Sequence, residues 1–455
     1  MTVARFFAIV AIWVSLVAGP ARAESLADTL RDAYHYSGLL DQNRALLRAA
    51  DEDVAQSLAA LRPLVTWQAG LQYADSTISP TRGLSDNTSA DLSITTSLLL
   101  YDSGASALAT EALKETVLRT RQELVEVEQE VLFRAVQAYM NVRRTSEFLA
   151  LRRSNVTVIS RELQAARDRF EVGEVTRTDV SLAEARLAAA RSLLAAAEGD
   201  LVQANEEFRA VVGRYPGQLQ VVNPAALQHD IAAAREFAVR RHPAVLAAQH
   251  RVTAAELNIR RAEASMNPTL SLRGTVGLDS TGNESRQLGL TYGGTLYQGG
   301  QLASLVRQAQ AQRDAARAGL LVTADLVSQN VGNAFAILQV ARASRLASDL
   351  QIRAARTAFR GVREEATLGA RTTLDVLNAE QELLDAQAAM ISAQADEVIA
   401  SYRVLAAMGL LTAEHLNLDV QTYDPAAYYN LVRDAPATYS EQGQALDRVL
   451  EALGE

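Results

Sequence analysis

An internal duplication constrains this chain more than any other feature of its sequence. Three short landmarks recur at one constant offset of 196 residues. They are residues 101–104 with 297–300, 173–180 with 369–376, and 211–213 with 407–409. Upstream of them the offset is 205, so the first half carries nine extra residues between Pro63 and Tyr101, where we expect an exposed loop. Both halves should therefore fold as the same supersecondary unit.

Each half contains two short segments in which apolar and polar residues alternate. The segments cover residues 64–77 and 89–101 in the first half, and 269–279 and 286–297 in the second. Polar turn residues separate the members of each pair, over 79–88 and 280–285. Alternation interrupted by turn residues predicts β-hairpins, at 64–101 and 269–297.

A long helical pattern follows each hairpin. Residues 105–171 contain neither Pro nor Gly, and a helix of that length extends about 100 Å. Apolar residues spaced four and three apart predict a heptad seam in each half. The seam residues are Leu320, Ala324, Val327, Val331, Ala334, Leu338 and Ala341, with Leu124, Val131 and Ala138 in the first half. Each long helix should end near Gly173 or Gly369, and a second helix should return to Gly213 or Gly409. The predicted fold is mainly α, with a small β part of four strands.

The N-terminus has the pattern of an export signal. Arg5 precedes an apolar run that ends at Ala18, and a small-x-small site closes at Ala23. We interpret residues 1–23 as a signal peptide, and a membrane anchor is the alternative. The chain has no cysteine, and its formal charge is −9, which argues against a nucleic-acid partner.

No later stretch is apolar enough for a transmembrane helix, so a membrane-spanning form would have to be a closed β-barrel. Four strands cannot enclose a lumen, so other copies would have to complete the sheet. The alternative is a β-subdomain that caps a coiled coil in water. The strand pattern alone leaves both open.

Two segments at matching repeat positions carry a family resemblance. Residues 169–186 and 368–383 resemble the signature of the TolC family of outer-membrane efflux and secretion proteins. The resemblance implies a homotrimer in outer-membrane lipid, with a twelve-stranded β-barrel and a periplasmic α-barrel tunnel of twelve helices. It divides the mature chain into repeats at 24–213 and 241–409, an equatorial linker at 214–240, and an equatorial segment with a flexible tail at 410–455. We expect a short amphipathic helix in that tail.

The resemblance also implies a function and partners. Residues 369–381 and 423–434 are most similar to the type I secretion branch, which predicts an exit duct for protein export. A periplasmic adaptor would join the duct to an inner-membrane ABC or proton-driven transporter. The alternatives are drug or metal efflux with a proton-driven pump and, from another class, a non-channel periplasmic coiled coil.

The tip residues have two interpretations each. Thr176 with Asp179 and Thr372 with Asp375 have the form of a capping box. By resemblance, Asp375 would form a ring of three carboxylates that favours cations at the entrance. Asn378 stands where relatives carry a second ring carboxylate, which should weaken cation binding.

The resemblance also pairs Asp179 with Arg371 in a lock between the tips. Ala366 replaces an aromatic partner of that lock. The glycines Gly173 and Gly369 would cap the long helices. Apolar neighbours of these glycines would either receive an adaptor hairpin or pack locally; they are Val172, Val175 and Leu368.

Nothing in the sequence suggests catalysis or a cofactor. The five histidines lack metal-ligand spacing. Gly299 and Gly300 follow a strand, but no phosphate-loop lysine accompanies them. Energy for transport would have to come from a partner.

Overall fold

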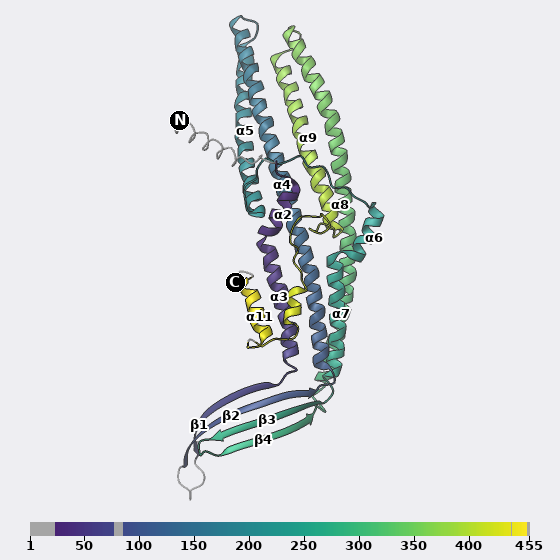
Figure 1. The fold of residues 1–455 in the computed structure, drawn as a ribbon. Coiled ribbons are helices and arrows are strands. Elements are labelled where there is room, and N and C mark those ends of the chain that lie inside the picture. The colour runs from purple at the N-terminus through teal and green to yellow at the C-terminus, as the bar shows by residue number, and fades with distance from the viewer. Residues whose placement is uncertain (1–22, 77–84, 438, 453–455) are drawn as a thin grey trace, which may run out of the picture. The chain divides into compact units, whose positions relative to one another are not determined.

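The computed structural model describes residues 23–76, 85–437 and 439–452 (Figure 1). The predicted signal peptide, apart from Ala23, and most of the predicted first hairpin turn lie outside these residues. The chain divides into two compact units. The first unit takes residues up to Asp41, then Glu126–Arg241 and Val327–Thr422; the second takes Gln42–Val125, His242–Leu326 and Tyr423–Glu455. Each unit draws on both sequence repeats.

Helices dominate the first unit. It contains α2 (Leu26–Tyr36), α5 (Arg177–Val212), α6 (Ile231–Arg241) and α9 (Thr373–Ala407). The two longest helices, α4 (Ala105–Glu171) and α8 (Gln301–Thr367), each have 67 residues and are divided between the units, as is α3 (Gly38–Ala59). Among the described residues, every helix is too short or too polar to cross a membrane.

Part of the predicted heptad seam is buried in the first unit. Val331 and Leu338 of α8 are fully buried, as is Ala138 of α4. Val327 and Ala341 are also buried, whereas Leu320 and Ala324 are half-buried and belong to the second unit. Small alanine side chains in this seam permit a close approach of the helices, and the larger Tyr139 and Phe208 are fully buried in the same unit.

All four strands belong to the second unit and form one antiparallel sheet in the order β1-β2-β3-β4. The strands are β1 (Leu64–Ser76), β2 (Ser85–Tyr101), β3 (Thr269–Asp279) and β4 (Glu284–Gly293). The central β2–β3 pair joins the two repeats, with Thr95 opposite Thr275. The predicted mainly α fold with four strands is confirmed.

The last predicted strand was too long. We expected it to reach Tyr297, but β4 ends at Gly293. The next pair in this ladder would be Gly294 with Pro268, and proline has no N–H to donate, so the ladder stops. Gly299 and Gly300, with φ of +56° and +84°, turn the chain into α8.

The register of the sheet separates apolar from polar side chains. Trp67 pairs with Ile94, which pairs with Val276, so these residues share one face. The other large apolar or aromatic residues of that face are Val65, Leu71, Tyr73, Leu92, Leu98, Tyr101, Leu270, Leu272, Leu278, Leu288, Leu290 and Tyr292, and the charged Glu284 and Arg286 lie on it at the turn end of β4. The opposite face carries mainly Ser, Thr, Gln and Gly. The apolar face is open to solvent: Trp67 is 77% exposed and Leu71 is 79% exposed.

The C-terminal segment adds α10 (Ala427–Val432) and α11 (Glu441–Ala452) to the second unit. Val432 and Leu446 are buried in a small core with Ala55 of α3. The Tyr428 hydroxyl donates a hydrogen bond to Glu52 Oε1 at 2.7 Å. The segment predicted as a tail therefore contains a helix with a buried apolar side chain.

Candidate functional site

The two helical hairpins of the first unit end in the same turn. Gly173 follows α4 with φ +82°, and Gly369 follows α8 with φ +80°. The Gly173 N–H donates to Phe170 O at 3.0 Å, and the Glu174 N–H donates to Arg169 O at 2.9 Å. The second tip repeats these two bonds at 3.1 and 2.9 Å. Glycine suits this position because the left-handed conformation has no Cβ clash there.

A capping box starts each returning helix. Thr176 Oγ1 accepts from the Asp179 N–H at 3.3 Å, and the Thr176 N–H donates to Asp179 Oδ2 at 2.9 Å. Thr372 and Asp375 make the same two bonds at 3.2 and 3.0 Å. The Thr176 hydroxyl is the main cause that lowers the pKa of Asp179, and the Thr372 N–H is the main cause for Asp375. Both carboxylates are therefore charged at neutral pH.

Arg371 has a partner in its own tip. Its Nε donates to Glu365 Oε2 at 2.8 Å, and this hydrogen bond is the main cause that raises the pKa of Arg371. Within the described part of one chain, no ion pair joins Arg371 to Asp179. The sequence interpretation missed Glu365, since a contact across six residues of a turn has no periodic signal.

Asn378 faces the first hairpin. Its Oδ1 accepts from Arg186 Nη2 of α5 at 3.2 Å. The adjacent Leu377 is buried in a core with Leu163 of α4 and Leu187 of α5. The two hairpins are therefore packed together just behind the tips. Leu377 and Arg186 were not predicted, although the apolar spacing of α9 marks Leu377 as inward-facing.

The apolar tip residues differ in their exposure. Leu368 is 85% exposed and Val172 is 71% exposed, whereas Val175 is half-buried and Ala366 is buried. Leu368 and Val172 are therefore free to contact another protein. Ala366, in contrast, is not accessible to a partner.

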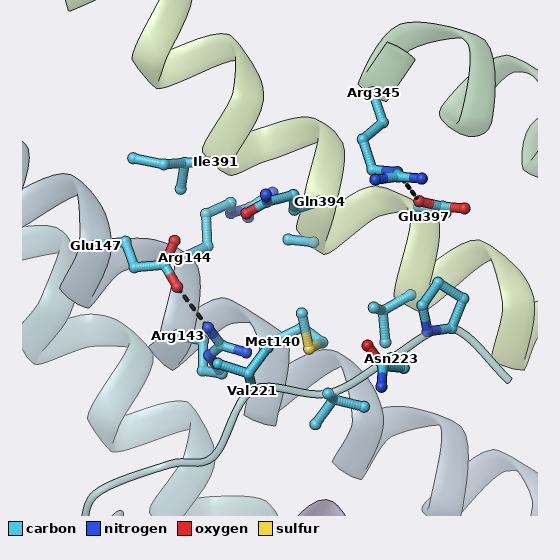
Figure 2. A pocket seen from close by; sticks show the side chains of 14 residues that line it. Met140, Arg143, Arg144, Glu147, Val221, Asn223, Arg345, Ile391, Gln394 and Glu397 are labelled. Carbon is cyan, nitrogen blue, oxygen red and sulfur yellow. Dashed lines mark hydrogen bonds and ion pairs between the residues drawn. The ribbon is translucent and has the colours of Figure 1, made fainter. Parts of the chain in front are cut away.

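A cavity of about 270 Å³ lies elsewhere in the first unit, between α4, α9 and residues 221–224 (Figure 2). Arg345 points at Glu397, with Nε and Oε2 2.5 Å apart, and Arg143 points at Glu147, with Nη2 and Oε1 2.6 Å apart. Carboxylates already pair with these two arginines, and we assign no ligand to the cavity.

The comparisons with known proteins decide the family. The family model described as "Outer membrane efflux protein" matches residues 31–214 and 235–410, which is most of the chain. The chain belongs to this family. Outer membrane efflux protein BepC of Brucella suis is 34% identical over 422 residues, which cover 91% of each chain.

More distant relatives are named for different tasks. Outer membrane protein TolC of Escherichia coli is 25% identical, over 87% of this chain and 84% of TolC. Alkaline protease secretion protein AprF of Pseudomonas aeruginosa is 24% identical, over 87% of this chain and 88% of AprF. The resemblance to the TolC family is confirmed.

Solved structures share the fold. The CmeC outer membrane channel of Campylobacter jejuni superposes with a TM-score of 0.76 at 15% identity, over 91% of this chain and 90% of CmeC. The family consists of channels rather than enzymes, so the predicted channel class is confirmed and the alternative of a non-channel coiled coil is not supported. The protein lies in the outer membrane.

Proposed function

We propose that three copies of this chain form an exit duct, and the exposed apolar face of the sheet carries this proposal. In a protein that contacts only water, that face would pack on a core. Here residues such as Trp67, Leu71 and Leu288 are exposed, while the opposite face is polar. Strands that alternate in this way suit a sheet with lipid on one side and water on the other. Transfer of each large apolar side chain from water is worth about 1.5–3 kcal/mol.

The edges of the sheet support a homotrimer. In the described chain, β1 and β4 each pair with a strand on one side only. An unpaired backbone group in lipid costs several kcal/mol, so neighbouring copies would complete both edges. Three copies supply twelve strands, enough to close the sheet around a lumen.

The proposed task of the duct is type I protein secretion. Residues 369–381 cover the second tip turn and the start of α9, and they carry the run that resembles this branch. The similarity to AprF extends over most of the chain. The exposed side chains of Val172 and Leu368 suit docking of a periplasmic adaptor, which would link the duct to an inner-membrane ABC transporter. Each of these two side chains would lose contact with water on docking, which favours the contact.

A second candidate is drug or metal efflux with a proton-driven pump. The observation that favours it is the similarity to BepC, which is named an efflux protein and shares 34% identity with this chain against 24% for AprF. The same duct would serve either transporter.

The deciding experiment compares a deletion strain with its parent. Proteins in the culture supernatant are identified by mass spectrometry, and growth is tested on a panel of drugs and metals. Loss of one or a few secreted proteins at unchanged tolerance supports type I secretion and identifies the cargo. Increased sensitivity with an unchanged supernatant supports efflux instead.

We also propose that the tips form the entrance gate, with the three Asp375 carboxylates as a cation-selective ring and Asn378 beside it. Arg371 of one copy would contact Asp179 of the next. This contact would compete with the Glu365 partner that Arg371 has within its own tip.

We expect Arg371→Ser to raise the leak conductance of the duct several-fold, because the gate would lose a charged contact between copies. Single-channel recording in planar lipid bilayers measures the effect, and Asp179→Ser should reproduce it. Arg353→Ser is the matched control, since Arg353 is exposed on α8 and pairs with Asp349 in its own helix. Unchanged conductance in both tip variants would refute the lock, and an increase in Glu365→Gln alone would assign closure to the pair within the tip.

A further inference from the structure

A buried carboxylate lies between the two helical hairpins, behind the tips. Glu380 of α9 is five residues beyond Asp375, and it is only 7% exposed. Its Oε1 accepts a hydrogen bond from Asn155 Nδ2 of α4 at 3.1 Å, and Asn155 is also buried. Its Oε2 is buried and has no hydrogen-bond partner. A carboxylate in such a place is poorly compensated when it is charged.

The charges around Glu380 do not neutralise it. Glu162 of α4 is a like charge, and Arg363 of α8 is the facing cation. Arg363 Nη2 lies 3.5 Å from Glu162 Oε1, so its charge is shared with that second acid. From α5, Arg186 bonds to Asn378, and Leu187 belongs to the apolar core at this level.

Burial, followed by repulsion from Glu162, raises the pKa of Glu380 from its ordinary 4.5 to about 7. The Asn155 hydrogen bond and Arg363 act in the opposite direction. The Asp179 and Asp375 carboxyls at the tips have lowered pKa values, so they titrate in a different range.

We propose that Glu380 is a proton-binding site whose occupancy controls how firmly the α8–α9 hairpin packs on α4. A neutral Glu380 would keep its bond to Asn155 without a buried charge. A charged Glu380 would favour separation of the hairpins, because separation exposes it to water. This inference rests on the proposed role of the tips as an entrance, where packed hairpins correspond to the closed duct.

The direction of the pH effect follows from the two pKa values. Below about pH 4.5, Glu380 is protonated in both arrangements and does not disfavour packing. Between 4.5 and 7 the separated form loses its proton first, so packing weakens as the pH rises. Above 7 the carboxylate is charged in both forms, and the full penalty on packing remains. Since one pKa unit is a factor of ten, the ratio of packed to separated hairpins should fall at least about tenfold between pH 5 and pH 8.

Spin labels on the tips test this in the assembled full-length protein. The chain has no cysteine, so Val172→Cys and Leu368→Cys provide specific attachment points on the two tips. Pulsed electron paramagnetic resonance then measures the distances between the tips from pH 5 to pH 8. We expect a shift to longer distances with a midpoint between about 5 and 7, the range in which packing weakens. In Glu380→Gln, the distances between the tips should have at every pH the distribution that the labelled protein shows at pH 5.

Two further variants sharpen the test. Glu382→Gln is the matched control, because Glu382 is exposed on the same helix, and it should follow the unsubstituted labelled protein. Asn155→Ala removes a donor that stabilises the charged form, so it should move the midpoint to higher pH.

Either of two results overturns the proton site. The first is found in the labelled protein with Glu380 intact, so it needs no substitution in the buried cluster: the distance between the tips does not depend on pH, or its midpoint lies below about 5. The other is a pH response that persists in Glu380→Gln. Bilayer conductance recorded on the same samples separates the two proposals: tips that respond to pH without a change in conductance keep the proton site and overturn the entrance role.

Discussion

Replacement of Tyr139 by Ala is expected to lower the free energy of unfolding of the first compact unit by about 3–5 kcal/mol. Tyr139 lies on α4 and is fully buried. Its hydroxyl lies 2.8 Å from Gln220 O and 3.0 Å from Glu24 O, and burial raises its pKa to about 12, so it remains a donor. The substitution leaves a cavity, and it removes the hydroxyl donor from two backbone carbonyls.

The affected contacts hold the N-terminal segment against the segment between the repeats. The Glu24 N–H donates to Gln218 O at 2.7 Å, and the Gln220 N–H donates to Glu24 O at 2.9 Å. Hydrogen exchange of the full-length protein, followed by mass spectrometry, should show loss of protection in these segments and in α4. Tyr139→Phe removes only the hydroxyl and should cost about 1–2 kcal/mol.

The matched control for Tyr139 is Tyr439→Ala. Tyr439 is almost fully exposed, so its removal should change stability by less than about 0.5 kcal/mol. A loss below about 1 kcal/mol in Tyr139→Ala would contradict the role assigned to this side chain.

Gly213→Ala is expected to destabilise the first unit by about 2–4 kcal/mol, for two reasons that add. Gly213 ends α5 with φ +89°, a conformation that an L-residue adopts with strain. A Cβ atom there would also lie 2.5 Å from Cδ2 of Tyr36, the last residue of α2. The ring would have to move away from the end of α5.

Gly369→Ala separates strain from steric overlap. Gly369 has φ +80°, but a Cβ atom there would meet no other atom within 4 Å. Only the strain remains, which is about 1–2 kcal/mol. Hydrogen exchange measures both losses of stability. It is followed in α2 and α5 for Gly213→Ala, and in the second tip for Gly369→Ala. Equal losses in the two variants would show that the contact with Tyr36 contributes nothing.

The sequence alone determined those parts of the protein whose causes act locally or repeat along the chain. The heptad spacing predicted the buried faces of Val331 and Leu338, because a helix returns each such residue to the same side. The glycines at 173 and 369 and the Thr–Asp boxes after them were predictable, since a cap involves residues only a few positions apart. Strand alternation located the hairpins, although the end of β4 depended on Pro268, which is distant in the sequence.

Only the tertiary structure decided how distant elements meet. The pairing register placed Trp67, Ile94 and Val276 on one exposed face, and a shift of a single residue would have moved each to the other side. Packing of α9 on the first hairpin buried Glu380 beside Asn155, which are 225 residues apart. No local sequence pattern predicts that a carboxylate will be buried away from water, because its burial depends on which helices cover it. The periodicity of the chain therefore predicted its elements, and their packing set the chemistry behind the tips.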